Sequence, residues 1–124
     1  MGLFNSRNKL QKNWLPLTDE SQIEDIIKAS FDKPQVIFKD STSCGISAGV
    51  KHGLVGDWGT LSDGVDLHYL DLLSYRSVSN KVAEISGVVH QSPQVIVYHL
   101  GKVIADTSHF AINVKYIEDV VAAI

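Results

Sequence analysis

Apolar side chains recur at helical spacing in four parts of the chain. In the first part, Ile23, Ile26, Ile27 and Phe31 follow the spacing i, i+3, i+4, i+8. This spacing predicts an amphipathic helix with one apolar face. Thr18 suits the N-cap of that helix, because acidic residues follow it where the helix dipole favours negative charge. Pro34 ends the helical segment.

Three further helices are predicted. The first begins near Cys44 and ends in the glycine-rich loop 53–64, the second runs from about 77 to 86 and ends at Gly87, and the third follows an Asn113 cap. Their expected buried positions are Ile46, Val50 and Leu54 in the first, Val78, Val82 and Ile85 in the second, and Ile117, Val120, Val121 and Ile124 in the third.

Short apolar or alternating runs between these helices predict strands. They are the edge segment Leu15–Leu17, Gln35–Lys39, Val65–Leu73, Gln94–His99 and Lys102–Asp106. Leu100 and Gly101 join the last two as a hairpin turn. The order β-α-β-α-β-α-β-β-α describes a parallel sheet that gains an antiparallel hairpin at its end. This α/β order is typical of the thioredoxin-like fold, with a central mixed sheet of four to five strands and helices on both faces.

The composition limits how many domains the chain can form and which classes of partner it can bind. A chain of 124 residues, 44% of them hydrophobic, can bury one sizeable core, so we expect one domain over 15–124 after an N-terminal tail, 1–14. The formal net charge is -3 and basic residues form no run, which argues against nucleic acid and membrane as partners. No apolar stretch reaches the length of a membrane span. The evenly mixed charge favours a monomer.

The N-terminus and the cysteine count bear on the compartment. The start lacks the apolar region and cleavage site of a secretory signal, and a single cysteine cannot form an internal disulfide. A reducing cytoplasm fits best. The first six residues match the acylation pattern for Gly2, but an ordinary tail whose Leu3 and Phe4 dock on the domain is the favoured interpretation.

The lone cysteine, Cys44, lies in the stretch DSTSCGIS, just past a buried strand and at the start of a helix. A thiol reacts as its thiolate, and the ordinary pKa of about 8.5 keeps most of it protonated at neutral pH. Unpaired N–H groups at a helix N-terminus stabilise the anionic sulfur. Hydroxyls of Thr42, Ser43 and Ser47 can add hydrogen bonds. The alternative is a small buried side chain without reactivity, which these polar neighbours disfavour.

A second candidate element is Ser92-Pro93, which begins a predicted strand. In a thioredoxin-like domain, the proline at this point is usually cis and lies opposite the thiol. The residue before it then offers backbone hydrogen bonds to an extended substrate. The simpler alternative is a trans proline that merely starts the strand.

Several motifs resemble one known family. The stretch STSCGIS and the segment 75–110 are similar to the YtxJ-like monothiol bacilliredoxins, small thioredoxin-fold proteins of bacteria that use bacillithiol in place of glutathione. The resemblance runs from about Leu15 onward. Its most specific parts are Cys44-x-Ile46-Ser47, Val78-Ser79-Asn80, Ser92-Pro93-Gln94 and Ser108-His109-Phe110.

The resemblance implies a monothiol exchange reaction without cofactor or metal. Cys44 would take bacillithiol from its mixed disulfide with a client protein, and a second low-molecular-weight thiol or a partner redoxin would reset it. The implied substrate-binding residues are Thr42, Ser43, Gly45, Ser47, Ser92, Pro93 and His109. The family's usual string is TCPIS, so Ser43 and Gly45 depart from it. Gly45 frees backbone, which makes the sulfur more mobile or supplies another N–H donor.

Rival chemistry has weaker support. Residues 45–49, GISAG, satisfy the nucleophile-elbow pattern of α/β-hydrolases, and Asp71, Asp106 and His109 follow Ser47 in the expected order. However, the elbow serine stands on the turn itself, whereas Ser47 should lie a full turn inside the helix. The five histidines show no metal-binding spacing, and the glycine-rich loop lacks a phosphate-binding motif.

Some roles stay open at this point. Trp58 either packs its loop onto the core, which we favour, or lines the thiol cleft. His109 either assists proton transfer, holds the bacillithiol headgroup, or caps a loop. A different class of function is a non-catalytic binding module whose cysteine is idle and whose Pro93 edge docks a peptide. Such a module would show an ordinary thiol titration and no exchange.

Overall fold

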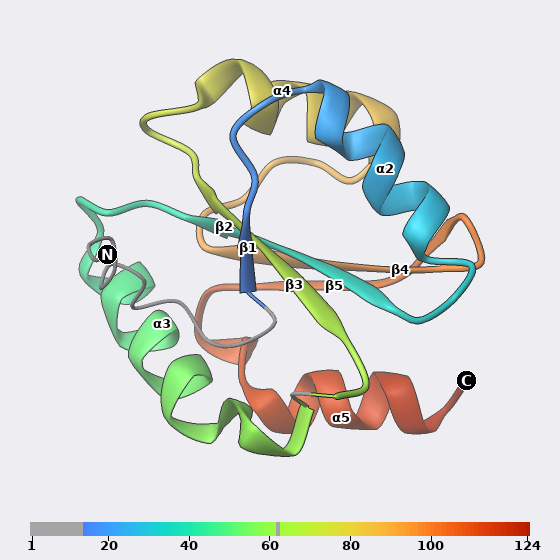
Figure 1. Cartoon of the computed structure of the whole chain (residues 1–124). Helices are drawn as coiled ribbons and strands as arrows, with labels where there is room; N and C mark the ends of the chain where they lie inside the picture. The colour runs from blue at the N-terminus through green and yellow to red at the C-terminus, as the bar shows by residue number, and fades with distance from the viewer. Residues whose placement is uncertain (1–13, 62) are drawn as a thin grey trace, which may run out of the picture.

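The structure, a computed structural model that describes residues 14–61 and 63–124, is a mixed sheet between two layers of helices (Figure 1). The strands are β1 (Trp14–Pro16), β2 (Gln35–Asp40), β3 (Asp66–Asp71), β4 (Gln94–His99) and β5 (Lys102–Ser108). The helices are α2 (Ser21–Ala29), α3 (Gly45–Asp57), α4 (Arg76–Ser86) and α5 (Val114–Ala122), with 3₁₀ turns η1 (Trp58–Leu61) and η2 (His109–Ala111).

The strand order in the sheet is β1-β3-β2-β4-β5. β3 pairs in parallel with both β1 and β2, while β4 runs antiparallel to β2 and β5. The predicted parallel sheet with a terminal antiparallel hairpin is therefore confirmed. In the ladder between β2 and β4, Lys39 lies opposite Gln94, which brings the start of β4 beside the end of β2.

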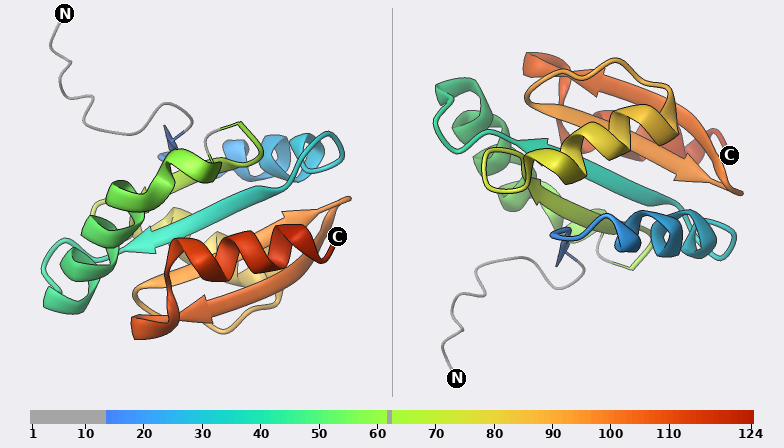
Figure 2. Two further views of the ribbon diagram at one scale, coloured as in Figure 1. Left: turned by 90° about the horizontal axis from the view of Figure 1, so that it is seen from below. Right: turned by 90° about the horizontal axis from the view of Figure 1, so that it is seen from above.

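Each face of the sheet contributes to its own hydrophobic cluster. Successive residues of β2 alternate between the faces: Phe38 packs on the side of α3 and α5, and Ile37 on the side of α2 and α4. Figure 2 shows the two helix pairs on opposite faces. All six residues of β2 are buried, because the strand is covered on both faces.

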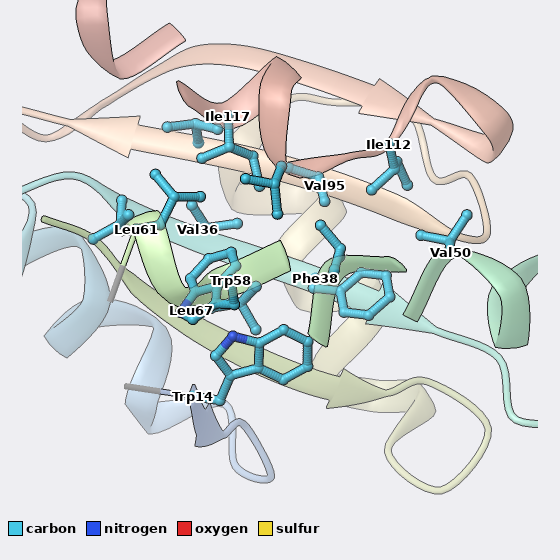
Figure 3. Close-up of a cluster of buried hydrophobic side chains, with 14 residues drawn as sticks. Trp14, Val36, Phe38, Val50, Trp58, Leu61, Leu67, Val95, Ile112 and Ile117 are labelled. Carbon is cyan, nitrogen blue, oxygen red and sulfur yellow. The ribbon is translucent and has the colours of Figure 1, made fainter. Parts of the chain in front are cut away.

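Two tryptophans anchor the larger cluster. Trp58, 1% exposed, packs edge-on against Trp14 with ring centroids 5.5 Å apart (Figure 3). This confirms that Trp58 packs onto the core. The loop expected from Gly53 is instead the last turn of α3 followed by η1. Leu54 and Trp58, one turn apart and both buried, hold this glycine-rich segment in helical conformation.

The predicted start of α2 is wrong. Thr18 is not the N-cap, because the helix begins at Ser21 after Glu20 and has no side-chain cap. The side chain of Gln22 folds back instead, and its Oε1 accepts from the backbone N–H groups of Thr18 and Asp19 at 2.8 Å and 2.9 Å. Gln22 thus holds the chain just before the helix, and the donor at the helix start, the N–H of Ser21, is met by the carboxylate of Asp19 at 2.9 Å.

Three apolar residues that the helical patterns assigned to buried faces are exposed: Phe31, Ile85 and Ile124. Phe31 lies beyond the end of α2, and its ring covers Gly101 in the hairpin turn, where an added Cβ would come within 2.7 Å of the ring. Leu100 and Gly101 both have positive φ, as a two-residue hairpin turn requires. The sequence predicted the two turn residues, but it did not predict that the ring of Phe31 packs over Gly101.

The predictions for Gly2, Leu3 and Phe4 lie outside the described residues. Within residues 14–61 and 63–124, no helix combines the length and hydropathy that crossing a bilayer requires. The described core begins at Trp14, whose side chain is buried in the larger cluster.

Candidate active site

Cys44 is the N-cap residue of α3, as the apolar pattern predicted. Its backbone is extended, with φ -104° and ψ 125°, and its carbonyl accepts the first helical hydrogen bond, from the N–H of Ala48 at 3.1 Å. Its own N–H donates to the carbonyl of Ser41 at 3.0 Å, which closes the turn after β2. The thiol is free and partly exposed. The side chain therefore stands where unpaired helix N–H groups converge.

The surroundings of the sulfur lower the pKa of Cys44. The strongest cause is the backbone N–H of Ser47, followed by that of Ile46, and both favour the anionic sulfur by hydrogen bonding. The Ser47 hydroxyl acts in the same direction. Partial burial and the Asp40 carboxylate oppose them and raise the pKa. The net effect is a thiol with more thiolate character at neutral pH than an ordinary cysteine.

Ser47 is fully buried in the first turn of α3. Its Oγ accepts a hydrogen bond from the backbone N–H of Ser41 at 3.2 Å, so it ties the helix to the turn before Cys44. A hydroxyl that is 0% exposed cannot attack a substrate. This burial excludes the nucleophile-elbow interpretation of residues 45–49.

The other predicted residues of the cysteine loop have different surroundings. Thr42, Ser43 and Gly45 are exposed. The Ser43 hydroxyl lies 3.5 Å from that of Ser41. Among the described residues, the hydrogen bonds include none from the hydroxyls of Thr42 or Ser43 to the sulfur. These residues therefore border the thiol as open surface and do not tune it directly.

The peptide bond between Ser92 and Pro93 is cis, so the trans alternative is wrong. Pro93 directly precedes β4, whose first residue pairs with Lys39, and this register brings it to the same sheet end as Asp40. The chain reaches Cys44 four residues after Asp40. The start of α3 and the segment that leads into β4 thus lie at one end of the sheet (Figure 1). The Ser92 hydroxyl is buried and has no hydrogen-bond partner among the described residues.

His109 joins this end of the sheet through its backbone. Its N–H donates to the carbonyl of Pro93 at 3.0 Å, and its φ of 57° is left-handed. The residue follows β5 and begins η2, and its neighbour Phe110 is 79% exposed. The structure thus shows His109 closing a loop, while its ring is half-buried without a hydrogen bond to another described residue.

An apolar groove of about 300 Å³ adjoins the cysteine. Its lining residues are Gly45, Ile46, Gly49, Val50, Gly53, Asp57, Phe110, Ile112 and Asn113. Gly45 and Ile46 follow Cys44 directly, so one end of the groove lies beside the backbone of Cys44. Asp57 is the one charged residue of this lining.

A polar cluster around the buried Asp40 escaped the sequence analysis. Asp40 is 2% exposed, and its carboxylate accepts a hydrogen bond from the hydroxyl of Tyr69. Lys51 donates to the same hydroxyl at 3.2 Å and lies 4.4 Å above the tyrosine ring. Burial raises the pKa of Asp40, while Tyr69 and Lys51 partly offset that rise. An aspartate that ends a buried strand four residues before the cysteine was the available signal.

Replacing Asp40 with asparagine should lower the pKa of Cys44. The carboxylate raises that pKa through its negative charge, and asparagine keeps an oxygen that can accept from Tyr69. Alkylation rates followed over pH would show the thiolate forming at lower pH in Asp40→Asn than in the wild type.

Asp57→Asn is the matched control, because it removes an equal charge at the far end of the same helix, roughly 20 Å from Cys44 at 1.5 Å per residue. It should leave the thiol titration unchanged. An equal shift in both variants, or none in Asp40→Asn, would contradict the role assigned to Asp40.

Metal chemistry finds no support in the described residues, where no three histidine, cysteine, aspartate or glutamate side chains form a cluster able to hold an ion. His68 is an example of a histidine whose surroundings give it a role in the core. It is 7% exposed, its Nε2 lies 2.7 Å from the amide oxygen of Gln35, and burial lowers its pKa to about 4. It is a hydrogen-bonded neutral histidine of the core.

Known structures share this fold. A protein described as an oxidoreductase candidate with a thioredoxin fold is 25% identical, with a TM-score of 0.77 over 87% of this chain and 93% of its own. Mitochondrial thioredoxin 3 from Saccharomyces cerevisiae is 19% identical, with a TM-score of 0.67 over 89% and 94%. Thioredoxin from Trypanosoma brucei brucei is 14% identical, with a TM-score of 0.72 over 93% and 94%. The fold is thioredoxin-like.

Sequence comparison identifies the family within this fold. The model of the monothiol bacilliredoxin BrxC family matches residues 15–117, which is most of the chain. The match spans Cys44, the cis peptide at Pro93, and His109. Together with the fold, it supports a thiol-disulfide redox function. The chain belongs to the BrxC family of monothiol bacilliredoxins.

Proposed function

We propose that the protein removes bacillithiol from mixed disulfides with client protein cysteines. The observation that carries this proposal is the position of the chain's single thiol. Cys44 caps α3, has a lowered pKa, and lies at the sheet end that holds the cis peptide before Pro93. The sequence contains no second cysteine, so any disulfide that Cys44 forms must join it to another molecule.

The reaction consists of two exchange steps. The Cys44 thiolate attacks the bacillithiol sulfur, forming a new disulfide as the bond between bacillithiol and the client breaks. The client sulfur leaves as a thiolate and takes up a proton. The thiolate of a second bacillithiol, or of a partner redoxin, then attacks the bacillithiol sulfur held by Cys44. This second step oxidises the incoming thiol and returns Cys44 as a thiolate.

The groove beside Cys44 supports a protein client. Ile46, Val50, Phe110 and Ile112 make it apolar, and Asp57 is its one charged residue. Such a lining suits an apolar client side chain next to the modified cysteine, and it suits the anionic carboxylates of bacillithiol poorly. We propose that the client occupies the groove and that Ser92 and Pro93 face the extended backbone around its cysteine.

The reduced wild-type protein, mixed with a peptide whose cysteine carries bacillithiol, tests this function. Intact-mass spectra should show a protein adduct of one bacillithiol and the release of free peptide thiol. Protein whose Cys44 has first been alkylated is the control and should show neither. An adduct that contains the peptide, or no adduct at all, would refute the proposed reaction.

A binding module with an idle cysteine is the alternative function. It predicts a thiol that titrates at its ordinary pKa of about 8.5. The N–H groups of Ser47 and Ile46 at the sulfur oppose this alternative, since they lower the pKa of Cys44. Ultraviolet absorbance of the thiolate over pH separates the two functions without any substrate.

A further inference from the structure

A lysine is fully buried on the sheet face opposite the α3 layer. Lys39 in β2 is 0% exposed, and none of the ion pairs among the described residues includes it. Its Nζ donates to the carbonyl of Ser79 in α4 at 3.1 Å and lies 3.1 Å from Nδ1 of His90. An ammonium group without a carboxylate partner is costly in such a place. The network around it therefore merits a functional explanation.

The partner His90 lies in segment 88–93, which connects α4 to β4 and carries the cis peptide. Residues 89–92 make no backbone-to-backbone hydrogen bond with other described residues. Side chains hold the segment instead. Ser86 accepts from the N–H of Val88 at 3.1 Å, and the amide of Gln94 donates to the carbonyl of Val89 at 2.9 Å. The contact between Lys39 and His90 joins the segment to β2, and at its end the carbonyl of Pro93 accepts from the N–H of His109.

The contact with Lys39 determines which ring nitrogen of His90 carries the proton. An ammonium has only donors, so Nδ1 of His90 must accept and the ring proton lies on Nε2. Burial lowers the pKa of His90 first, and the charges of Lys39 and Arg76 lower it further. At neutral pH the imidazole is therefore a neutral acceptor, suited to this bond. The network joins Lys39 of β2, Ser79 of α4 and His90 of the segment.

We infer that Lys39 is a positioning residue for the exchange reaction. By holding His90 it fixes segment 88–93, and with it the cis peptide that is presented to the client backbone. This inference rests on the proposed function, because it assigns the segment a role toward an extended client. It gives Lys39 no contact with the reacting sulfur atoms.

Lys39→Met tests the inference, because methionine fills a similar volume but cannot donate to His90. Exchange with the bacillithiolated peptide should fall roughly 10- to 100-fold, as small displacements of positioning groups can cause. Exchange with a small symmetric disulfide, such as hydroxyethyl disulfide, should stay at the wild-type rate, and so should the pKa of Cys44. The exposed Lys102→Met removes an equal charge from β5 and should change neither rate.

His90→Leu removes the acceptor and tests the bond from its other side. It should show the same selective loss with the peptide. If both variants fold and exchange with the peptide at the wild-type rate, or lose both rates equally, Lys39 has no positioning role.

Nuclear magnetic resonance separates this inference from the proposed function. The ring nitrogens of His90 should report the Nε2–H tautomer in the wild type, and Lys39→Met should lose that preference and shift the backbone signals of residues 89–93. Unchanged signals would overturn the inference. A wild type that fails to react with the peptide would instead refute the proposed function, and the tautomer comparison would still decide the role of Lys39.

Discussion

Replacing Cys44 with serine should reduce exchange with a bacillithiolated peptide to the uncatalysed rate. The chain has no other thiol, and a serine hydroxyl is not ionised at neutral pH. The fold should survive, because Cys44 is partly exposed and serine is a favoured N-cap residue. Peptide thiol release gives the rate, and circular dichroism checks the fold.

A variant in which the thiol is moved by one residue along the chain is a more specific control for this experiment. The double variant Cys44→Ser, Ser43→Cys keeps one cysteine in the same exposed loop but moves it off the N-cap position. Its thiol should titrate near the ordinary value of about 8.5 and exchange more slowly at neutral pH. If it matched the wild type, the helix terminus would have no part in the activity.

The second large effect concerns stability. Burial lowers the pKa of Lys39 from 10.5 to about 8, which corresponds to about 3 kcal/mol. Between these two values the unfolded chain binds the proton more tightly than the folded protein does, so the free energy of unfolding rises with pH. The wild type should therefore gain up to about 3 kcal/mol between pH 7.5 and pH 10.5 relative to Lys39→Met.

Denaturant unfolding at a series of pH values measures this difference. Groups common to both proteins titrate alike, so subtracting the two curves isolates Lys39. The exposed Lys102→Met should run parallel to the wild type throughout. If the curves of the wild type and Lys39→Met were also parallel, the ammonium would not be buried in solution as the structure has it.

Local patterns predicted the elements that hold the thiol. The buried run Gln94–His99 and the Leu100-Gly101 turn define the hairpin within a few residues, and the apolar spacing that starts at Ile46 placed Cys44 at a helix start. These signals are short-range, because each depends on neighbours within one turn or one strand. The family resemblance, carried by motifs around Cys44 and Pro93, is confirmed by the family match.

Long-range polar contacts could not be predicted in this way. His90 is 51 residues from Lys39, and Tyr69 is 29 from Asp40, so no spacing rule connects them. A single lysine or aspartate at the end of an apolar run could equally mark the point at which the strand leaves the core and its side chain reaches solvent. The sheet register decides that both side chains are buried and which groups they meet.

Side chains that replace expected contacts explain the local errors. Asp19, and not Thr18, accepts from the N–H of Ser21 at the start of α2, while Gln22 accepts from the N–H groups of Thr18 and Asp19. Phe31 covers the hairpin turn at Gly101, so a residue assigned to a helix face serves another element. In both cases the residue type suited the predicted role. The contact that formed instead involves a residue or element that the local pattern does not reveal.

The buried hydroxyl of Ser47 occupies the position where dithiol redoxins have their second sulfur, and this has a stoichiometric consequence. Under the proposed function, each oxidised copy of the protein retains one small thiol, since the chain has no second cysteine to release it by an intramolecular disulfide. Under the proposed function, the cellular abundance of the protein sets how much bacillithiol it can sequester during an oxidative burst, and recovery then depends on the supply of a second reductant.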